Sequence, residues 1–116
     1  MSSALNELRD VLRAFAAERD WDQFHSPKNL ASALTVEAAE LLEPFQWLTE
    51  EQSRMLSGEV LDKVSDELAD VFIYLIRLAD KLDVDLLSAA SRKMSKNAKK
   101  YPVDKSRGSS KKYTDL

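Results

Sequence analysis

Apolar residues recur at helical spacing along almost the whole chain, and little in the sequence interrupts them. Only two glycines and three prolines occur in 116 residues, and no window alternates polar and apolar residues as a half-buried strand does. The sequence therefore predicts an all-α fold, a four-helix bundle with an extended C-terminal tail. The length fits one domain, which we expect over residues 1–102, followed by a basic tail over 103–116.

Local signals indicate where the helices begin and end. Ser26 followed by Pro27 is an N-cap with proline at the first helical position. Thr49 and Gln52 have the spacing of a capping box on a short helical turn. Asp83 is expected to cap the last long helix, which Pro102 stops. The four expected long helices span approximately residues 4–19, 27–47, 59–81 and 84–100.

Charge is distributed unevenly. Residues 1–91 carry 8 Lys/Arg against 18 Asp/Glu, whereas residues 92–116 carry 9 Lys/Arg against 2 Asp/Glu. The basic end either neutralises the acidic body, within one chain or between chains, or meets a phosphate. A nucleic-acid binder is disfavoured, because the body is acidic and Asp104 and Asp115 interrupt the basic segment.

The composition also bears on the compartment. There is no cysteine, which excludes disulfides and thiolate chemistry. No stretch approaches the roughly 20 apolar residues of a membrane span, and the chain does not start with a basic region followed by an apolar run. We expect a cytoplasmic protein with no membrane partner.

Two pairs of carboxylates fall on apolar helical stripes. Glu37 and Glu40 lie on the expected second helix, and Glu67 and Asp70 on the third. At about 100° per residue, an apolar stripe surrounds each pair. The stripe residues are Leu30, Ala33, Leu34, Leu41 and Pro44 on the second helix, and Val60, Val64, Val71, Tyr74 and Leu78 on the third.

Carboxylates that point into a core need partners, because burying an unpaired one costs several kcal/mol. A bound cation would serve, and oxygen ligands without cysteine favour Mg²⁺, with Mn²⁺ as a substitute. Salt bridges to Lys63, Arg77 or the basic fourth helix are the alternative, and the residues alone leave both open. A di-iron bundle needs Glu-x-x-His pairs, and the only histidine, His25, lies in an expected loop.

The same residues resemble the MazG-like all-α nucleotide pyrophosphohydrolase family, particularly its dCTP pyrophosphatase branch. The family motif is Glu-x-x-Glu, a spacer, then Glu-x-x-Asp, and here Glu37–Glu40 and Glu67–Asp70 are separated by 26 residues. Further similarity lies in FAAERDWDQFHSPKNL (15–30), EPFQW (43–47), SDELADVFIYL (65–75), and RKMSKNAKKYP and SSKKYTDL near the C-terminus.

The resemblance implies Mg²⁺-dependent hydrolysis between the α and β phosphates of a nucleoside triphosphate, giving a monophosphate and pyrophosphate. It implies that Glu37, Glu40, Glu67 and Asp70 hold the metal, with Glu40 or Glu37 as the catalytic base. The substrate is expected to be dCTP or a modified deoxynucleotide, in nucleotide-pool sanitation. The dCTP branch has a histidine where this chain has Leu12.

The resemblance also implies the substrate-binding residues. Trp21, Trp47 and Tyr74 would contact the base, since aromatic faces suit a planar ring. Capping of the core is the other interpretation of the two tryptophans. Lys93 and Asn97, one turn apart on the fourth helix, would bind the triphosphate, with Lys93 as a charge clamp.

Association is expected on two grounds. Apolar residues on several helix faces, such as Phe72, Ile73 and Ile76, exceed what one layer of this length can bury. The resemblance implies a homo-oligomer, a tetramer or a dimer. The alternative function is a catalytically silent helical oligomer that binds a partner through its basic tail.

Overall fold

The computed structural model describes residues 3–116, and this part of the chain contains helices and no strand. The all-α prediction is confirmed. The elements are α1 (Ser3–Glu18), the 3₁₀ turn η1 (Asp22–Phe24), α2 (Pro27–Leu42), α3 (Glu50–Ser53), α4 (Gly58–Lys81), α5 (Leu86–Lys100), α6 (Val103–Ser106) and the 3₁₀ turn η2 (Tyr113–Asp115).

The predicted caps of α2 and α3 are confirmed. Ser26 accepts a hydrogen bond from the Asn29 amide, and Thr49 and Gln52 form the reciprocal capping box. However, α2 ends at Leu42 and gives way to turns, about five residues before the expected end. Pro44 accounts for this, because it has no amide hydrogen and its ring would collide with the helical carbonyl four residues earlier.

The cap of α5 is a correction. Asp85, not Asp83, accepts the bond from the Ser88 amide. Asp83 lies at φ 53°, a left-handed conformation that aspartate tolerates at a helix end. The chain therefore turns away from the axis of α4 at Asp83, and α5 begins two residues later than expected.

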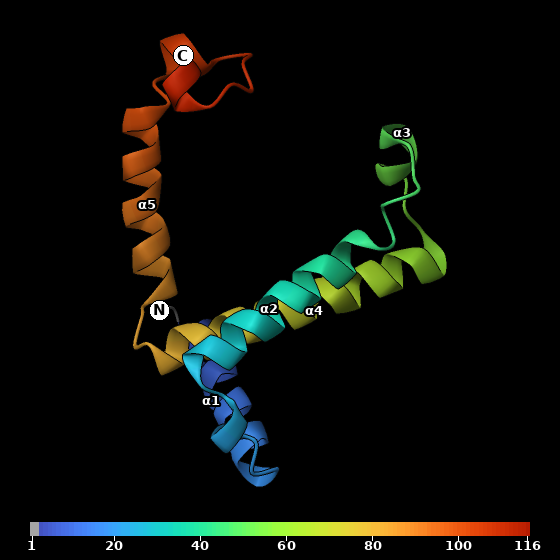
Figure 1. The fold of residues 1–116 in the computed structure, drawn as a ribbon, viewed down its shortest axis with the longest axis vertical. Coiled ribbons are helices and arrows are strands. Elements are labelled where there is room, and N and C mark those ends of the chain that lie inside the picture. Colours follow the sequence, from blue (N-terminus) through green and yellow to red (C-terminus); the bar gives the residue numbers. More distant parts are fainter. Residues whose placement is uncertain (1–2) are drawn as a thin grey trace.

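The body of the molecule is a helical hairpin crossed by α1. Helices α2 and α4 run side by side in opposite directions and are joined at the far end by the segment that contains α3, while α1 crosses α4 near its C-terminal end (Figure 1). Leu30 of α2 and Ile76 of α4 are fully buried. This hairpin fixes the relative positions of the carboxylate pairs predicted on its two helices.

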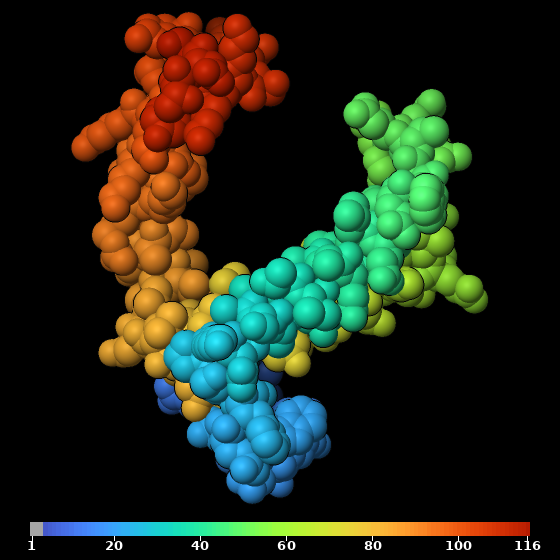
Figure 2. Space-filling view, viewed as in Figure 1, coloured from blue at the N-terminus to red at the C-terminus, as the bar shows by residue number. Residues whose placement is uncertain are grey.

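Helix α5 stands apart from the hairpin, so the expected four-helix bundle is not completed within one chain (Figure 1). Figure 2 shows a wide opening between the arm made by α5 and the arm made by α2, α3 and α4. The radius of gyration is 17.6 Å, whereas a compact domain of this length has about 13 Å. None of the helices in residues 3–116 is long and apolar enough to cross a membrane.

The C-terminal segment is less extended than expected. It contains the short helix α6 and the turn η2, and it folds back on the end of α5. The rings of Tyr101 and Tyr113 meet edge-on with centroids 5.9 Å apart. Lys100 Nζ lies 4.8 Å from the centroid of the Tyr113 ring, a cation–π contact.

Candidate active site

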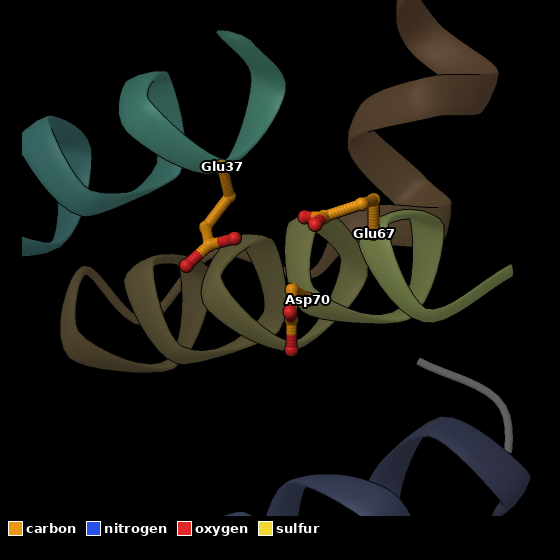
Figure 3. A group of neighbouring side chains, drawn as sticks. All are labelled: Glu37, Glu67 and Asp70. Carbon is orange, nitrogen blue, oxygen red and sulfur yellow. The ribbon is translucent and has the colours of Figure 1, made fainter. Parts of the chain in front are cut away.

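Three of the four predicted carboxylates converge between α2 and α4. Glu37 points from α2 toward α4, where Glu67 and Asp70 lie one turn apart (Figure 3). One oxygen from each of the three lies within 4.8 Å of the others. Ligand bonds of about 2.1 to 2.5 Å to a divalent ion place coordinating oxygens at such separations.

The convergence leaves polar atoms without partners. Oε2 of Glu37 and Oε2 of Glu67 are both buried and accept no hydrogen bond within the described chain. Burial, then contact with Glu40 and the charges of Asp70 and Glu67, raises the pKa of Glu37 to about 7. Burial and the charges of Glu40 and Asp70 also raise the pKa of Glu67. The cluster therefore concentrates negative charge between α2 and α4.

Glu40 belongs to the same cluster, one turn beyond Glu37 on α2. It is half-buried, and its charge acts on both Glu37 and Glu67. It is not among the three whose oxygens lie within 4.8 Å of one another.

The salt-bridge alternative finds little support. No ion pair joins any of the four acids to a basic side chain of residues 3–116. Lys63 acts on Glu67 at a distance, and Arg77 pairs elsewhere, with Asp22. Glu37, Glu67 and Asp70 therefore fit a hard divalent cation, with Glu40 beside them. Such an ion would offset their repulsion and give the unpartnered oxygens a ligand.

An apolar cavity of about 70 Å³ has Ile73, Tyr74 and Arg77 of α4 in its wall, on the part of the helix that follows Asp70. Two of the predicted base-contacting residues, Trp21 and Tyr74, line this cavity. Leu12, at the position where the dCTP branch has histidine, is also in its wall. The complete lining is Leu12, Phe15, Ala16, Trp21, His25, Ile73, Tyr74 and Arg77.

The remaining predicted substrate residues lie elsewhere in the chain. Trp47 follows α2 in a turn and is 87% exposed, with no place in this cavity. Lys93 and Asn97 lie on α5, which stands away from the carboxylates (Figure 1). One chain therefore does not gather all the predicted residues.

Sequence reasoning missed the polar group next to the apolar cavity. Arg77, considered there only as a partner for the carboxylates, is 4% exposed and lies in the cavity wall. It contacts Asp22 and His25, which were assigned only to a loop. The available signal was a charged residue on the apolar side of a long helix, which requires a buried partner.

Three comparisons agree with this geometry. The MazG-like family matches residues 33–116. A protein from Bos taurus named dCTP pyrophosphatase 1 is 46% identical over 114 residues, which cover 97% of this chain and 68% of that protein. Its Homo sapiens counterpart is 44% identical and is covered to 67%. The crystal structure of a pyrophosphatase from Archaeoglobus fulgidus superposes with a TM-score of 0.78 and 42% identity, over 88% of this chain and 95% of that one. The chain therefore belongs to the MazG-like family.

Proposed function

We propose that this protein is a Mg²⁺-dependent nucleoside triphosphate pyrophosphohydrolase. It cleaves between the α and β phosphates, releases a nucleoside monophosphate and pyrophosphate, and acts on dCTP or a modified deoxynucleotide to keep the nucleotide pool clean. The enzyme class follows from membership of the family and from relatives named as pyrophosphatases. The metal requirement and the substrate are the proposal.

The observation that carries the proposal is the cluster of acids with unpartnered buried oxygens. Glu37, Glu40, Glu67 and Asp70 would hold the ion, and Mn²⁺ could replace Mg²⁺ because both accept carboxylate oxygens. A bound divalent ion supplies neutralisation of the charge that develops on the phosphates during in-line displacement.

The chain's own residues supply a base and a site for the substrate. Glu40, or Glu37, would take a proton from the attacking water. The pKa of Glu37 is raised to about 7 in the metal-free chain, and a bound cation would favour its ionised form, which is the form that can accept a proton. Trp21 and Tyr74 would contact the base across the apolar cavity.

The site would be completed by association. Because α5 stands away from the carboxylates of its own chain, we propose that Lys93 and Asn97 reach the triphosphate bound to a neighbouring copy, and that Trp47 is covered there too. Large apolar side chains left exposed on α5 support this, among them Leu87 and Met94. We propose a homotetramer in the cytoplasm, with a homodimer as the alternative assembly.

The test is a pyrophosphate assay. The protein is incubated with Mg²⁺ and a panel of triphosphates, and orthophosphate is measured with and without an added inorganic pyrophosphatase. We expect signal only after that enzyme is added. Glu40→Gln and Asp70→Asn should lower kcat/KM about a hundredfold or more, while Glu50→Gln, an exposed acid on α3, leaves it unchanged.

Two results would count against the proposal. Orthophosphate that appears without the added pyrophosphatase means cleavage at the terminal phosphate. No turnover on any nucleotide, with a folded protein and Mg²⁺ or Mn²⁺ present, favours the silent partner-binding oligomer.

A further inference from the structure

Arg77 is a buried cation between two cavities. It lies on α4 with 4% of its surface exposed. On one side is the apolar cavity that contains Trp21, and on the other a charged cavity of about 410 Å³ lined by Arg13, Ala17, Asp22, Arg77, Asp80 and Lys81. Removing a guanidinium from water is costly unless it is well paired, so its partners indicate what it holds.

Its shortest contacts lie on the loop between α1 and α2. One terminal nitrogen donates to Asp22 Oδ1 at 3.1 Å and to His25 Nδ1 at 3.0 Å. The partner on its own helix is more distant, since the other terminal nitrogen lies 3.8 Å from Asp80 Oδ2. Arg13 of α1 already pairs with that carboxylate. Arg77 therefore holds the loop at both ends of η1.

The contact with His25 fixes the state of the imidazole. A guanidinium has only donors, so Nδ1 must accept, and the ring is neutral with its hydrogen on Nε2. Burial, followed by the charge of Arg77, lowers the pKa of His25, in agreement with a neutral ring. His25 is thus a fixed wall of the apolar cavity.

Trp21 lies directly before the segment that Arg77 holds. It immediately precedes Asp22, and its ring meets the Phe15 ring edge-on at 5.7 Å and the His25 ring at 6.4 Å between centroids. Its backbone amide donates to the Ala16 carbonyl, which fixes the other end of the loop. Lys81 Nζ also donates to Asp22 Oδ1, at 2.6 Å, so Arg77 shares the hold on Asp22. Within residues 3–116, the His25 ring has a hydrogen bond with Arg77 alone.

We propose that Arg77 is a positioning residue: through Asp22 and His25 it holds the indole of Trp21 in the wall of the apolar cavity that receives the substrate's base. This inference rests on the proposed function, because it takes the cavity to be the base subsite. Arg77 acts on the substrate through the loop, so its loss weakens binding of the base and spares the steps at the phosphates.

The position of Trp21 can be measured without any turnover. The chain has two tryptophans, so the Trp47→Phe protein carries Trp21 as the only reporter. In that background we expect Arg77→Gln to increase acrylamide quenching of Trp21 and to shift its emission to longer wavelength. Arg77→Lys should restore part of the effect. Arg13→Gln is the matched control, because Arg13 lines the charged cavity but does not contact the loop.

Kinetics with Trp47 intact give the second readout. Arg77→Gln should raise KM about tenfold and leave kcat within about twofold, the signature of lost uniform binding. Asp22→Asn is a second route to the same result. It leaves the buried guanidinium in place and removes the carboxylate charge that Arg77 and Lys81 share. Thermal melting of each variant shows that the comparison is made on folded protein.

The outcomes separate the inference from the function on which it rests. Unchanged quenching of Trp21 in both Arg77→Gln and Asp22→Asn overturns the clamp. A freed Trp21 with unchanged KM overturns the role of this cavity in binding the base, although hydrolysis itself stands. A parental protein that hydrolyses no triphosphate removes the proposed function, while the fluorescence still decides whether Arg77 holds the loop.

Discussion

At the scale of single residues, the protein places a cluster of carboxylates on helix faces that are otherwise apolar. Glu37 and Glu67 each keep a buried oxygen without a hydrogen-bond partner, and no basic side chain among residues 3–116 pairs with them. Such a cluster lowers the stability of the metal-free fold, because the acids repel one another and are partly removed from water. Removing one of these charges, or binding a cation, should therefore increase the stability of the native state.

This predicts the behaviour of Glu37→Gln in metal-free buffer. The pKa of Glu37 is raised from 4.5 to about 7 in the folded chain. Between those values only the folded state takes up the proton, so its stability falls as pH rises toward 7 and stays low above it. The variant lacks this loss. Its melting temperature should therefore exceed that of the parent above pH 7, and the two should converge as pH approaches 4.5.

The same melting series with Mg²⁺ reverses the order. The parent should gain stability from the ion, which binds only the folded state, and Glu37→Gln should gain less. Glu50→Gln, on exposed α3, should follow the parent throughout. A loss of several kcal/mol in metal-free Glu37→Gln would instead show that the carboxylate is a structural ion-pair partner.

At the scale of elements, local chemistry decided the helix ends. The cap at Ser26, with a 3.1 Å bond from the Asn29 amide, starts α2 and so sets the register of Glu37. Ser26→Ala should cost about 1 kcal/mol and lower the melting temperature by roughly 4 °C. Ser32→Ala, in the middle of the same helix, should be nearly neutral because the Ser32 hydroxyl bonds only a carbonyl already used by the helix. Equal losses would contradict the cap's role.

Periodicity and caps predicted the long helices and the positions of the carboxylates, because these depend on residues close in sequence. They failed at Asp83, where a left-handed residue turns the chain before α5, and at the late end assigned to α2. They also missed the clamp of Arg77 on Asp22, which joins residues 55 apart. Spacing along one helix carries no information about which distant loop a side chain will meet.

At the scale of the whole molecule, α5 carries large apolar side chains that the rest of residues 3–116 leaves exposed. Leu87 and Met94 form a stripe on α5: they are 48% and 66% exposed, and because they are seven residues apart they lie nearly on the same helix face. Lys93 lies next to the stripe. A neighbouring copy that covered the stripe would bring Lys93 to a second set of carboxylates.

Met94→Glu tests this arrangement. A charge in the stripe should lower the mass measured by light scattering and reduce kcat/KM about tenfold or more, because an incomplete triphosphate site would remain. Ser95→Glu, one residue along the same helix, should keep the parental mass and activity. Full activity from a chain that is monomeric at assay concentration would show that α5 does not complete the site.

The sparse interior has a consequence for how the protein responds to its own abundance. Few side chains are buried within residues 3–116, and only Leu30 and Ile76 are fully enclosed, so much of the energy that folds the chain would have to come from contacts between chains. Folding and assembly would then be one equilibrium, with a midpoint that moves with protein concentration. Dilution would then unfold the chains as well as dissociate them. The amount of active enzyme would rise more steeply than the amount of polypeptide synthesised.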